Sequence, residues 1–280
     1  MTAPSESAVP GSGKAHRSRR PALWRVSQLV HGAAAATCVA NPALWPWALA
    51  AVGVNQLALV SAVFSPRSHW LGANLVRGPA AGAVALTFDD GPNPALTPYV
   101  LEMLAQHDAR ASFFCVGDRA RQHPDLVRTV VAAGHSIENH SHEHPWWFAM
   151  LGPRALGRQI DRAQATLADI AGTPPTFFRA PMGFRSPLLD GALQQRGLRY
   201  ASWTRRGFDT TNRSSQSVLG YLTRGLAAGD ILLLHDGHSA RSREGSPVIQ
   251  AVLPQLLKVI RAAGLRAVSL PELAGVTMPH

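Results

Sequence analysis

A run of 41 residues between Arg25 and Arg67 contains no Asp, Glu, Lys or Arg. A bilayer-spanning helix needs about 20 apolar residues, so the run is long enough for one span, best placed at Leu44–Phe64, or for a hairpin of two. An Asn-Pro pair interrupts it near its middle, and tryptophans lie near the candidate helix ends, where interfacial aromatic residues belong. We therefore expect residues 22–66 to attach the chain to a membrane. The alternative is a buried helical pair packed on a soluble domain.

The arginines that flank this run bear on which side of the membrane the rest of the chain lies. Those before it, at positions 17, 19, 20 and 25, place the amino end inside by the positive-inside rule. Arg67 and Arg77 follow it and favour a return to the same side, which a hairpin achieves and a single span does not. A cleaved signal peptide is disfavoured because the residues after Ala40 remain strongly apolar. We expect a membrane-attached protein, at the inner or cytoplasmic membrane if the chain is bacterial, with the side of its larger domain left open.

The positive charge of the chain does not indicate nucleic-acid binding. Residues 1–21 are rich in Ser, Gly, Pro and Arg and lack apolar periodicity, which predicts a disordered basic arm. The net charge of +10 comes almost entirely from arginines, and these are scattered rather than arranged as a basic stripe between aromatic residues. We therefore expect no nucleic-acid partner. Cys38 and Cys115 lie in apolar segments and are expected to be free buried thiols.

Beyond Gly82 short apolar runs alternate with amphipathic segments, which is the pattern of strands separated by helices. This alternation predicts a parallel sheet with right-handed crossovers, open or closed into a barrel. We expect this domain to occupy residues 81–274, after a linker at 67–80 and before a tail at 275–280. The predicted helices include Thr97–Gln106, Pro153–Ile170 and Pro247–Ala262. The predicted strands are Ala83–Phe88, Ala111–Cys115, Ser136–Glu138, Thr176–Arg179, Tyr200–Trp203, Ile231–His235 and Ala267–Leu270.

Ionisable residues gather where the predicted strands end. In parallel α/β folds the chemistry lies at the carboxyl ends of the strands, so residues at these positions share one rim. Five of the predicted strands end in such groups, which is not expected of random placement. The groups are Asp89-Asp90, the stretch Asn139–Trp147, Arg179, Asp209 and His235-Asp236.

Two histidines on this rim have the spacing of metal ligands. His140 and His144 are four residues apart, so both can reach one ion. With one carboxylate from the Asp89-Asp90 pair they make three protein ligands, which leaves a fourth position for water, as in catalytic zinc sites. His142 is the alternative ligand, but its spacing from the pair favours a place in the cleft wall. The chain has neither the HExxH pattern of zinc proteases nor the GxSxG pattern of serine hydrolases.

Five stretches in this order resemble the motifs of the NodB-homology polysaccharide deacetylases, carbohydrate esterase family four. They are TFDDGP (Thr87–Pro92), HSHEH (His140–His144), RAPMG (Arg179–Gly183), WTRRGFD (Trp203–Asp209) and LLLHD (Leu232–Asp236). The resemblance covers about residues 80 to 272. It implies an α/β fold, a distorted seven-stranded (β/α) barrel, and a hydrolase that removes N-acetyl, or sometimes O-acetyl, groups from sugars with the help of a metal.

The resemblance also implies a role for each residue at the rim. Asp89 becomes the general base that acts on a metal-activated water, and Arg179 is its partner. His235 becomes the general acid, held by Asp209. The implied metal ligands are Asp90, His140 and His144, and the ion is expected to be zinc, although cobalt or nickel suits the same ligands. The implied substrate-binding residues are Met182, through its backbone N–H at an oxyanion site, and Trp203 and Leu233, which line the acetyl pocket and sugar groove.

Two departures from the family pattern concern the substrate. Arg206 and Thr210 stand where the family often has an additional acid and a Trp, and Met182 replaces a frequent Tyr. We expect an acetylated amino-sugar glycan as substrate, whether a polysaccharide, an oligosaccharide or a lipid-linked sugar. A noncatalytic membrane-anchored glycan-binding barrel and an O-acetyl esterase on the same scaffold are the alternative functions.

Overall fold

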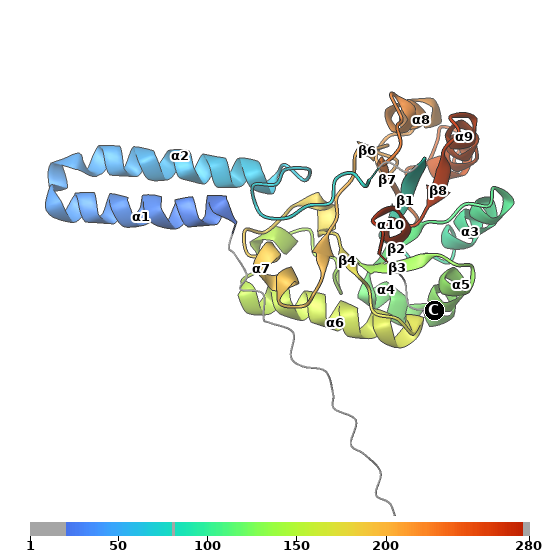
Figure 1. Ribbon diagram of the computed structural model, residues 1–280, viewed down its shortest axis with the longest axis horizontal. Helices are drawn as coiled ribbons and strands as arrows, with labels where there is room; N and C mark the ends of the chain where they lie inside the picture. The colour runs from blue at the N-terminus through green and yellow to red at the C-terminus, as the bar shows by residue number, and fades with distance from the viewer. Residues whose placement is uncertain (1–20, 80–81, 277–280) are drawn as a thin grey trace, which may run out of the picture.

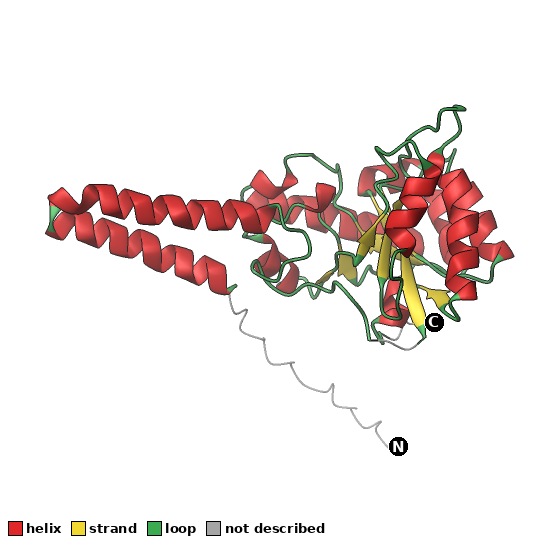
Figure 2. Ribbon diagram, turned by 90° about the horizontal axis from the view of Figure 1, so that it is seen from above, coloured by secondary structure: helices red, strands yellow, loops and turns green. Residues whose placement is uncertain are grey.

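The computed structural model describes residues 21–79 and 82–276. These residues form a long helical hairpin and an α/β domain (Figure 1). The predicted basic arm, except for its last residue, and the end of the predicted tail lie outside the described residues. In both views the hairpin projects from one side of the α/β domain (Figures 1 and 2).

The hairpin consists of α1 (Ala22–Ala40), a short turn of helix η1 (Pro42–Leu44) and α2 (Trp45–Val63). The Asn-Pro pair ends α1, because Asn41 adopts an extended conformation before the proline and its side chain accepts a hydrogen bond from the amide of Ala43. Each long helix has 19 residues, which corresponds to a length of roughly 28 Å at 1.5 Å per residue. The run without charged side chains thus folds as a pair of helices joined by a short turn.

Apolar side chains of the hairpin point outward rather than into a core. Val54 and Leu57 on α2 and Leu29 on α1 are among the exposed apolar residues. Pro42–Val63 is long and apolar enough to cross a membrane, with a mean hydropathy of 1.5 in its most apolar window. Between the helices lies a polar contact in which the Asn55 side-chain amide donates to the Ser27 hydroxyl over 3.0 Å. This helix pair is thus not buried against the α/β domain.

The domain is built on one parallel sheet. Its strands are β1 (Ala83–Asp89), β2 (Ser112–Cys115), β3 (Ser136–Asn139), β4 (Phe177–Phe178), β5 (Arg199–Tyr200), β6 (Arg205–Arg206), β7 (Ile231–His235) and β8 (Arg266–Val268). Their order is β5-β4-β3-β2-β1-β7-β6, with β8 paired to the first half of β1. Every residue of β1 is buried, as expected for the central strand of a parallel sheet covered on both faces.

The sheet curls without closing. The gap between its outer strands is bridged by the segment before β1, where Leu75 pairs with Ala201 and Arg77 pairs with Asp230. The predicted distorted barrel is confirmed, and all seven predicted strands are present, Ile231–His235 with the predicted ends and the other six with shifted ends. The short strand β6 is additional, because two consecutive arginines carry no apolar pattern by which a strand is recognised.

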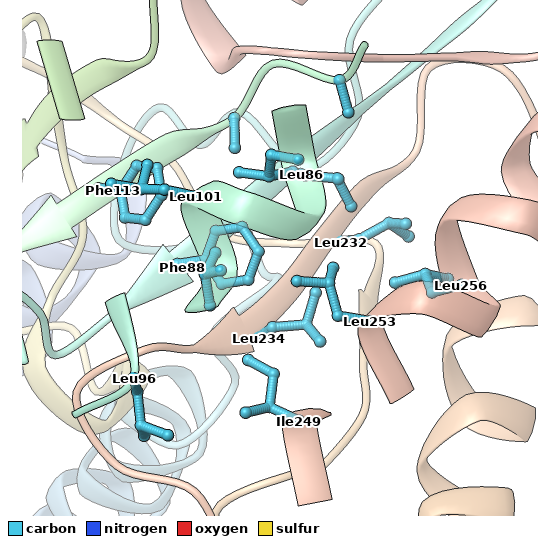
Figure 3. Packing of buried hydrophobic residues seen from close by; sticks show 14 of the residues in the cluster. Leu86, Phe88, Leu96, Leu101, Phe113, Leu232, Leu234, Ile249, Leu253 and Leu256 are labelled. Atoms are coloured by element: carbon cyan, nitrogen blue, oxygen red, sulfur yellow. The ribbon is translucent and has the colours of Figure 1, made fainter. Parts of the chain in front are cut away.

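Helices surround the sheet and enclose its main core. They are α3 (Thr97–Gln106), α4 (Gly117–Gln122), α5 (Pro124–Ala132), α6 (Pro153–Ala171), α7 (Leu189–Gln194), α8 (Ser215–Thr223), α9 (Val248–Ala262) and α10 (Leu270–Leu273), with the short helices η2 (Phe148–Met150) and η3 (Pro181–Gly183). Leu86 and Phe88 of β1 and Leu232 of β7 pack against Leu253 and Leu256 of α9 (Figure 3). This core holds the strands whose ends carry the site.

Candidate active site

One cavity lies at the carboxyl ends of β1, β3, β4 and β7, and eight of the ten site residues predicted from the sequence line it. These are Asp89, Asp90, His140, His144, Met182, Trp203, Leu233 and His235. The other two, Arg179 and Asp209, are fully buried behind the wall and contact lining residues. The rim expected from the strand pattern therefore gathers into a single site.

Three side chains in the cavity form a group that can hold a metal ion. One ligand atom from each of Asp90, His140 and His144 lies within 4.8 Å of the others. The Asp90 Oδ1 atom is 3.1 Å from Nε2 of His144 and 3.4 Å from Nε2 of His140. Burial raises the pKa of Asp90, but hydrogen bonds and charge from the two imidazoles outweigh it and hold this pKa well below its usual range.

The surroundings of His140 suit a metal ligand. Its Nδ1 atom lies 2.8 Å from the backbone carbonyl of Arg179, to which Nδ1–H donates, so Nε2 is the nitrogen that faces Asp90 and would bind an ion. One carboxylate and two imidazoles are also the ligand types of catalytic zinc sites. The residues present therefore fit one divalent ion, and His142, buried behind the loop near Gly117, is not part of the group.

The loops that carry these ligands are held in unusual backbone conformations. Asp90, Ser141 and His144 all have positive φ, at 72°, 65° and 53°, which costs free energy in residues other than glycine. The hydroxyl of Ser141 accepts a hydrogen bond from the amide of His144, and the side chain of Asn139 accepts one from the amide of Ser141. These bonds stabilise the strained turn that directs both imidazoles toward Asp90.

Asp89 is positioned by a buried arginine. The Nη1 atom of Arg179 lies 2.6 Å from Oδ1 of Asp89 and also donates to the hydroxyl of Thr87. Its other nitrogens donate to the carbonyls of Ala201 and Ser202, so the guanidinium is fully engaged. The Arg179 guanidinium forms a charge-assisted hydrogen bond to the Asp89 carboxylate at this distance and fixes its orientation toward the cavity.

His235 forms a pair with Asp209. Its Nδ1 atom lies 2.9 Å from Oδ1 of Asp209. The second oxygen of Asp209 accepts a hydrogen bond from the backbone amide of His235. Burial lowers the pKa of this imidazole, but Asp209, assisted by Asp89 and Asp90, more than compensates and raises the pKa to about 9. The imidazolium is therefore the prevalent form near neutral pH, and the side chain of His235 lines the cavity.

Five further residues line the cavity that the strand pattern did not predict. Gly183 belongs to η3 and Arg206 to β6, whereas Thr210, Thr211 and His238 lie in loops. Met182, at the cavity wall, has a φ of 58°. Gly183 and Phe184 donate to the carbonyls of Ala180 and Pro181, so the Met182 amide lies outside the hydrogen bonds of this turn. Its position agrees with the predicted oxyanion donor, a role that stays a prediction.

Known proteins share both the sequence and the fold. A family model described as polysaccharide deacetylase matches residues 77–201. A peptidoglycan-N-acetylglucosamine deacetylase of Bacillus cereus is 31% identical over 192 residues, which cover 68% of this chain and 87% of that protein. This chain belongs to the polysaccharide deacetylase family. A chitooligosaccharide deacetylase of Sinorhizobium fredii is 35% identical over 161 residues, which cover 57% of this chain and 74% of the Sinorhizobium protein.

A solved structure supports the same assignment for the deacetylase fold. The crystal structure of a peptidoglycan N-acetylglucosamine deacetylase in complex with a naphthalenyl N-hydroxybenzamide superposes with a TM-score of 0.67. It is 28% identical, and the match covers 74% of this chain and 95% of that one. The family and the barrel inferred from the five motifs are thereby confirmed, and the protein is a hydrolase that deacetylates amino-sugar glycans.

Proposed function

We propose that this deacetylase removes N-acetyl groups from glucosamine-type sugars in a metal-dependent hydrolysis, with Asp89 as general base and His235 as general acid. The observation that carries the proposal is the convergence on one cavity of a carboxylate fixed by Arg179, a three-residue metal-binding group and a histidine paired with Asp209. The substrates named for the relatives, peptidoglycan N-acetylglucosamine and chitooligosaccharide, support the choice of sugar.

The residues of the chain supply the proton transfers. Asp89 accepts a proton from the attacking water, and Arg179 keeps its oxygens oriented for that step. His235, charged and held by Asp209, donates a proton to the amine as the C–N bond breaks. Asp90, His140 and His144 would hold a divalent ion, zinc being our first choice and cobalt or nickel fitting the same ligands. Such an ion supplies Lewis acidity, which polarises the acetyl carbonyl and lowers the pKa of water.

Binding of the acetyl group and of the sugar falls to the cavity walls. Leu233 and Trp203 provide apolar surface for the methyl group and for a sugar ring, and both line the cavity. The amide of Met182 would donate to the oxygen that becomes negative in the transition state. These three residues are our proposed substrate-binding set.

We also propose that residues 22–66 attach the protein to a membrane. The outward apolar side chains and the roughly 28 Å length of both helices match a hydrocarbon layer of about 30 Å. A hairpin returns the chain to the side from which it entered, and the arginines at both of its ends favour the cytoplasmic side. The larger domain would then lie at the cytoplasmic membrane face.

The test of the proposed function is acetate release from N-acetylated chitooligosaccharides by the purified full chain. We expect a chelator to abolish turnover and added zinc to restore it, and His144→Ala to lose both zinc binding and turnover. The matched control is His107→Ala. His107 directly follows the last residue of α3 and does not line the cavity. Full turnover after complete removal of metal would contradict the proposal.

A further inference from the structure

We propose that the acetylated sugar is the head group of a lipid and is linked to that lipid through phosphate. This substrate class rests on the function proposed above and narrows it. Three independent features of the structure carry it: the fixed junction of the hairpin with the barrel, the apolar rim beside the metal-binding group, and an unpaired arginine in the cavity wall.

The junction is fixed because a buried arginine holds the segment between hairpin and barrel. Arg185 donates to the backbone carbonyls of Ser68, Leu71 and Ala73, each over 3.1 Å, and its guanidinium lies 4.2 Å from the ring of Tyr200. Asn74 also donates to carbonyls within this segment. A segment bound in this way cannot act as a flexible tether, so the membrane-inserted helices orient the barrel.

The end of the hairpin contacts the rim that carries the cavity. The ring of Phe64 packs edge to face on that of Phe184, with centroids 4.7 Å apart. The Arg67 guanidinium donates to the Thr204 carbonyl, which belongs to the loop after β5. Phe184 directly follows Gly183, a cavity residue. A bilayer around the hairpin therefore lies next to the opening of the active site.

The rim beside the metal-binding group is apolar and exposed where the chain continues from His144. Trp146, Trp147 and Met150 follow the ligand His144 and remain 68%, 45% and 72% exposed. The helix that begins after them, at Pro153, shares a crevice with Pro21 and Trp24 at the start of the hairpin. Exposed tryptophans beside a membrane-inserted element are typical of the lipid–water interface.

Arg206 adds a positive charge to the cavity wall. Its guanidinium lies 5.6 Å from the ring of Trp203 and 5.1 Å from that of Phe208, and its Nε atom is buried without a hydrogen bond. Within the part of the chain that the structure describes, no carboxylate lies within 4.0 Å of it, whereas its neighbour Arg205 pairs with Asp230. Arginine binds phosphate through charge-assisted hydrogen bonds. The cavity thus offers a partner to an anionic group next to the sugar, and a phosphate that joins sugar to lipid places that group at the membrane.

The proposal is tested with the full chain, loaded with zinc and reconstituted in phospholipid nanodiscs. Three substrates are compared by acetate release: N-acetylglucosamine joined by phosphate to a long-chain polyprenol, N-acetylglucosamine 1-phosphate without the lipid, and the neutral chitotetraose. We expect kcat/KM for the lipid-linked sugar to exceed that for the free sugar phosphate by a hundredfold or more. Arg206→Gln should lower kcat/KM for the lipid-linked sugar about tenfold or more relative to chitotetraose, the loss expected for a hydrogen bond to a charged group. Arg261→Gln on α9 is the matched control.

Equal kcat/KM for the two phosphate-containing substrates would overturn the lipid part of the proposal. An equal effect of Arg206→Gln on the lipid-linked sugar and on chitotetraose would overturn the phosphate part. In both cases turnover of chitotetraose shows that the deacetylase function stands. Failure to release acetate from all three substrates would contradict the proposed function itself, and the lipid-linked substrate with it.

Discussion

In the hairpin, leucine, valine and tryptophan side chains face outward and the polar pair Ser27 and Asn55 lies between the helices. In the barrel, apolar side chains fill the interior, and buried charged side chains lie at the carboxyl ends of the strands, as Asp89 and Arg179 do, and also elsewhere, as Asp230 does before β7. The first arrangement suits a lipid environment, where apolar contact with the surroundings costs nothing. The arrangement in the barrel removes charged side chains from water, which is tolerated only where ion pairs or hydrogen bonds compensate for the lost hydration. Buried polar groups therefore pair the two helices in the hairpin, whereas in the barrel they serve both structure, as at Arg185, and the proposed chemistry of the cavity.

The largest effect should follow from the loss of the buried charge in the barrel. Arg179→Met leaves Asp89 without its partner, and an uncompensated buried charge should lower the free energy of unfolding by about 3–5 kcal/mol. Chemical denaturation of the detergent-solubilised chain measures it. Arg121→Met, which breaks an exposed ion pair with Asp118, is the control and should change this free energy by about 1 kcal/mol or less. Similar losses for the two variants would contradict the structural role given to Arg179.

A charge on the outer face of the hairpin should weaken membrane insertion and leave the barrel intact. Val54 is exposed near the middle of α2, and an arginine at the centre of a span costs about 2.5–3.5 kcal/mol on insertion scales. We expect Val54→Arg to increase the fraction of protein that alkaline carbonate extracts from membranes, while Val54→Leu behaves as the wild type. Hydrolysis of a soluble oligosaccharide should persist in Val54→Arg. Unchanged extraction would argue that the hairpin does not reside in lipid.

The acid in the barrel should respond to pH through its partner. A general acid acts only while protonated, so turnover should decline as the pH rises through the pKa of His235. This pKa is about 9 in the absence of a metal ion, and a bound cation would offset the part of the increase that comes from Asp89 and Asp90. Asp209→Asn removes the main cause of the raised pKa. We expect this decline to move to lower pH and kcat to fall about 10²-fold, the lower end of what a general acid contributes. The pH dependence of kcat checks it, and an unmoved alkaline limb would exclude His235 as the acid.

The smallest effect should come from the polar contact within the hairpin. Hydrogen bonds between membrane helices contribute about 0.6 kcal/mol on average in double-mutant cycles. We expect a cycle of Ser27→Ala and Asn55→Ala to give a coupling free energy of this size in mixed micelles, with no change in kcat for a soluble oligosaccharide. A coupling free energy of several kcal/mol would place a critical polar network in the hairpin and weaken the contrast with the barrel.

Much of the fold and the site follows from local sequence pattern. Strand β1 is an apolar run that ends at two acidic residues, and His140 and His144 have a spacing that brings them to one turn. Both features can be predicted from the sequence. The fixed junction was not predictable, because Arg185 contacts carbonyls more than 100 residues away in sequence. Strand β6 and the loop residues Thr211 and His238 likewise depend on tertiary context rather than on pattern.

Turnover by Asp89→Asn, with the zinc content determined on the same sample, separates proton transfer from ion binding. Proton transfer is proposed for Asp89, and ion binding for Asp90, His140 and His144. We expect a folded variant that binds one zinc per chain and releases acetate from N-acetylated chitooligosaccharides at least about 10²-fold more slowly than Asp125→Asn, an exposed control on α5. Turnover equal to that of the control, with zinc bound, would exclude Asp89 as the general base.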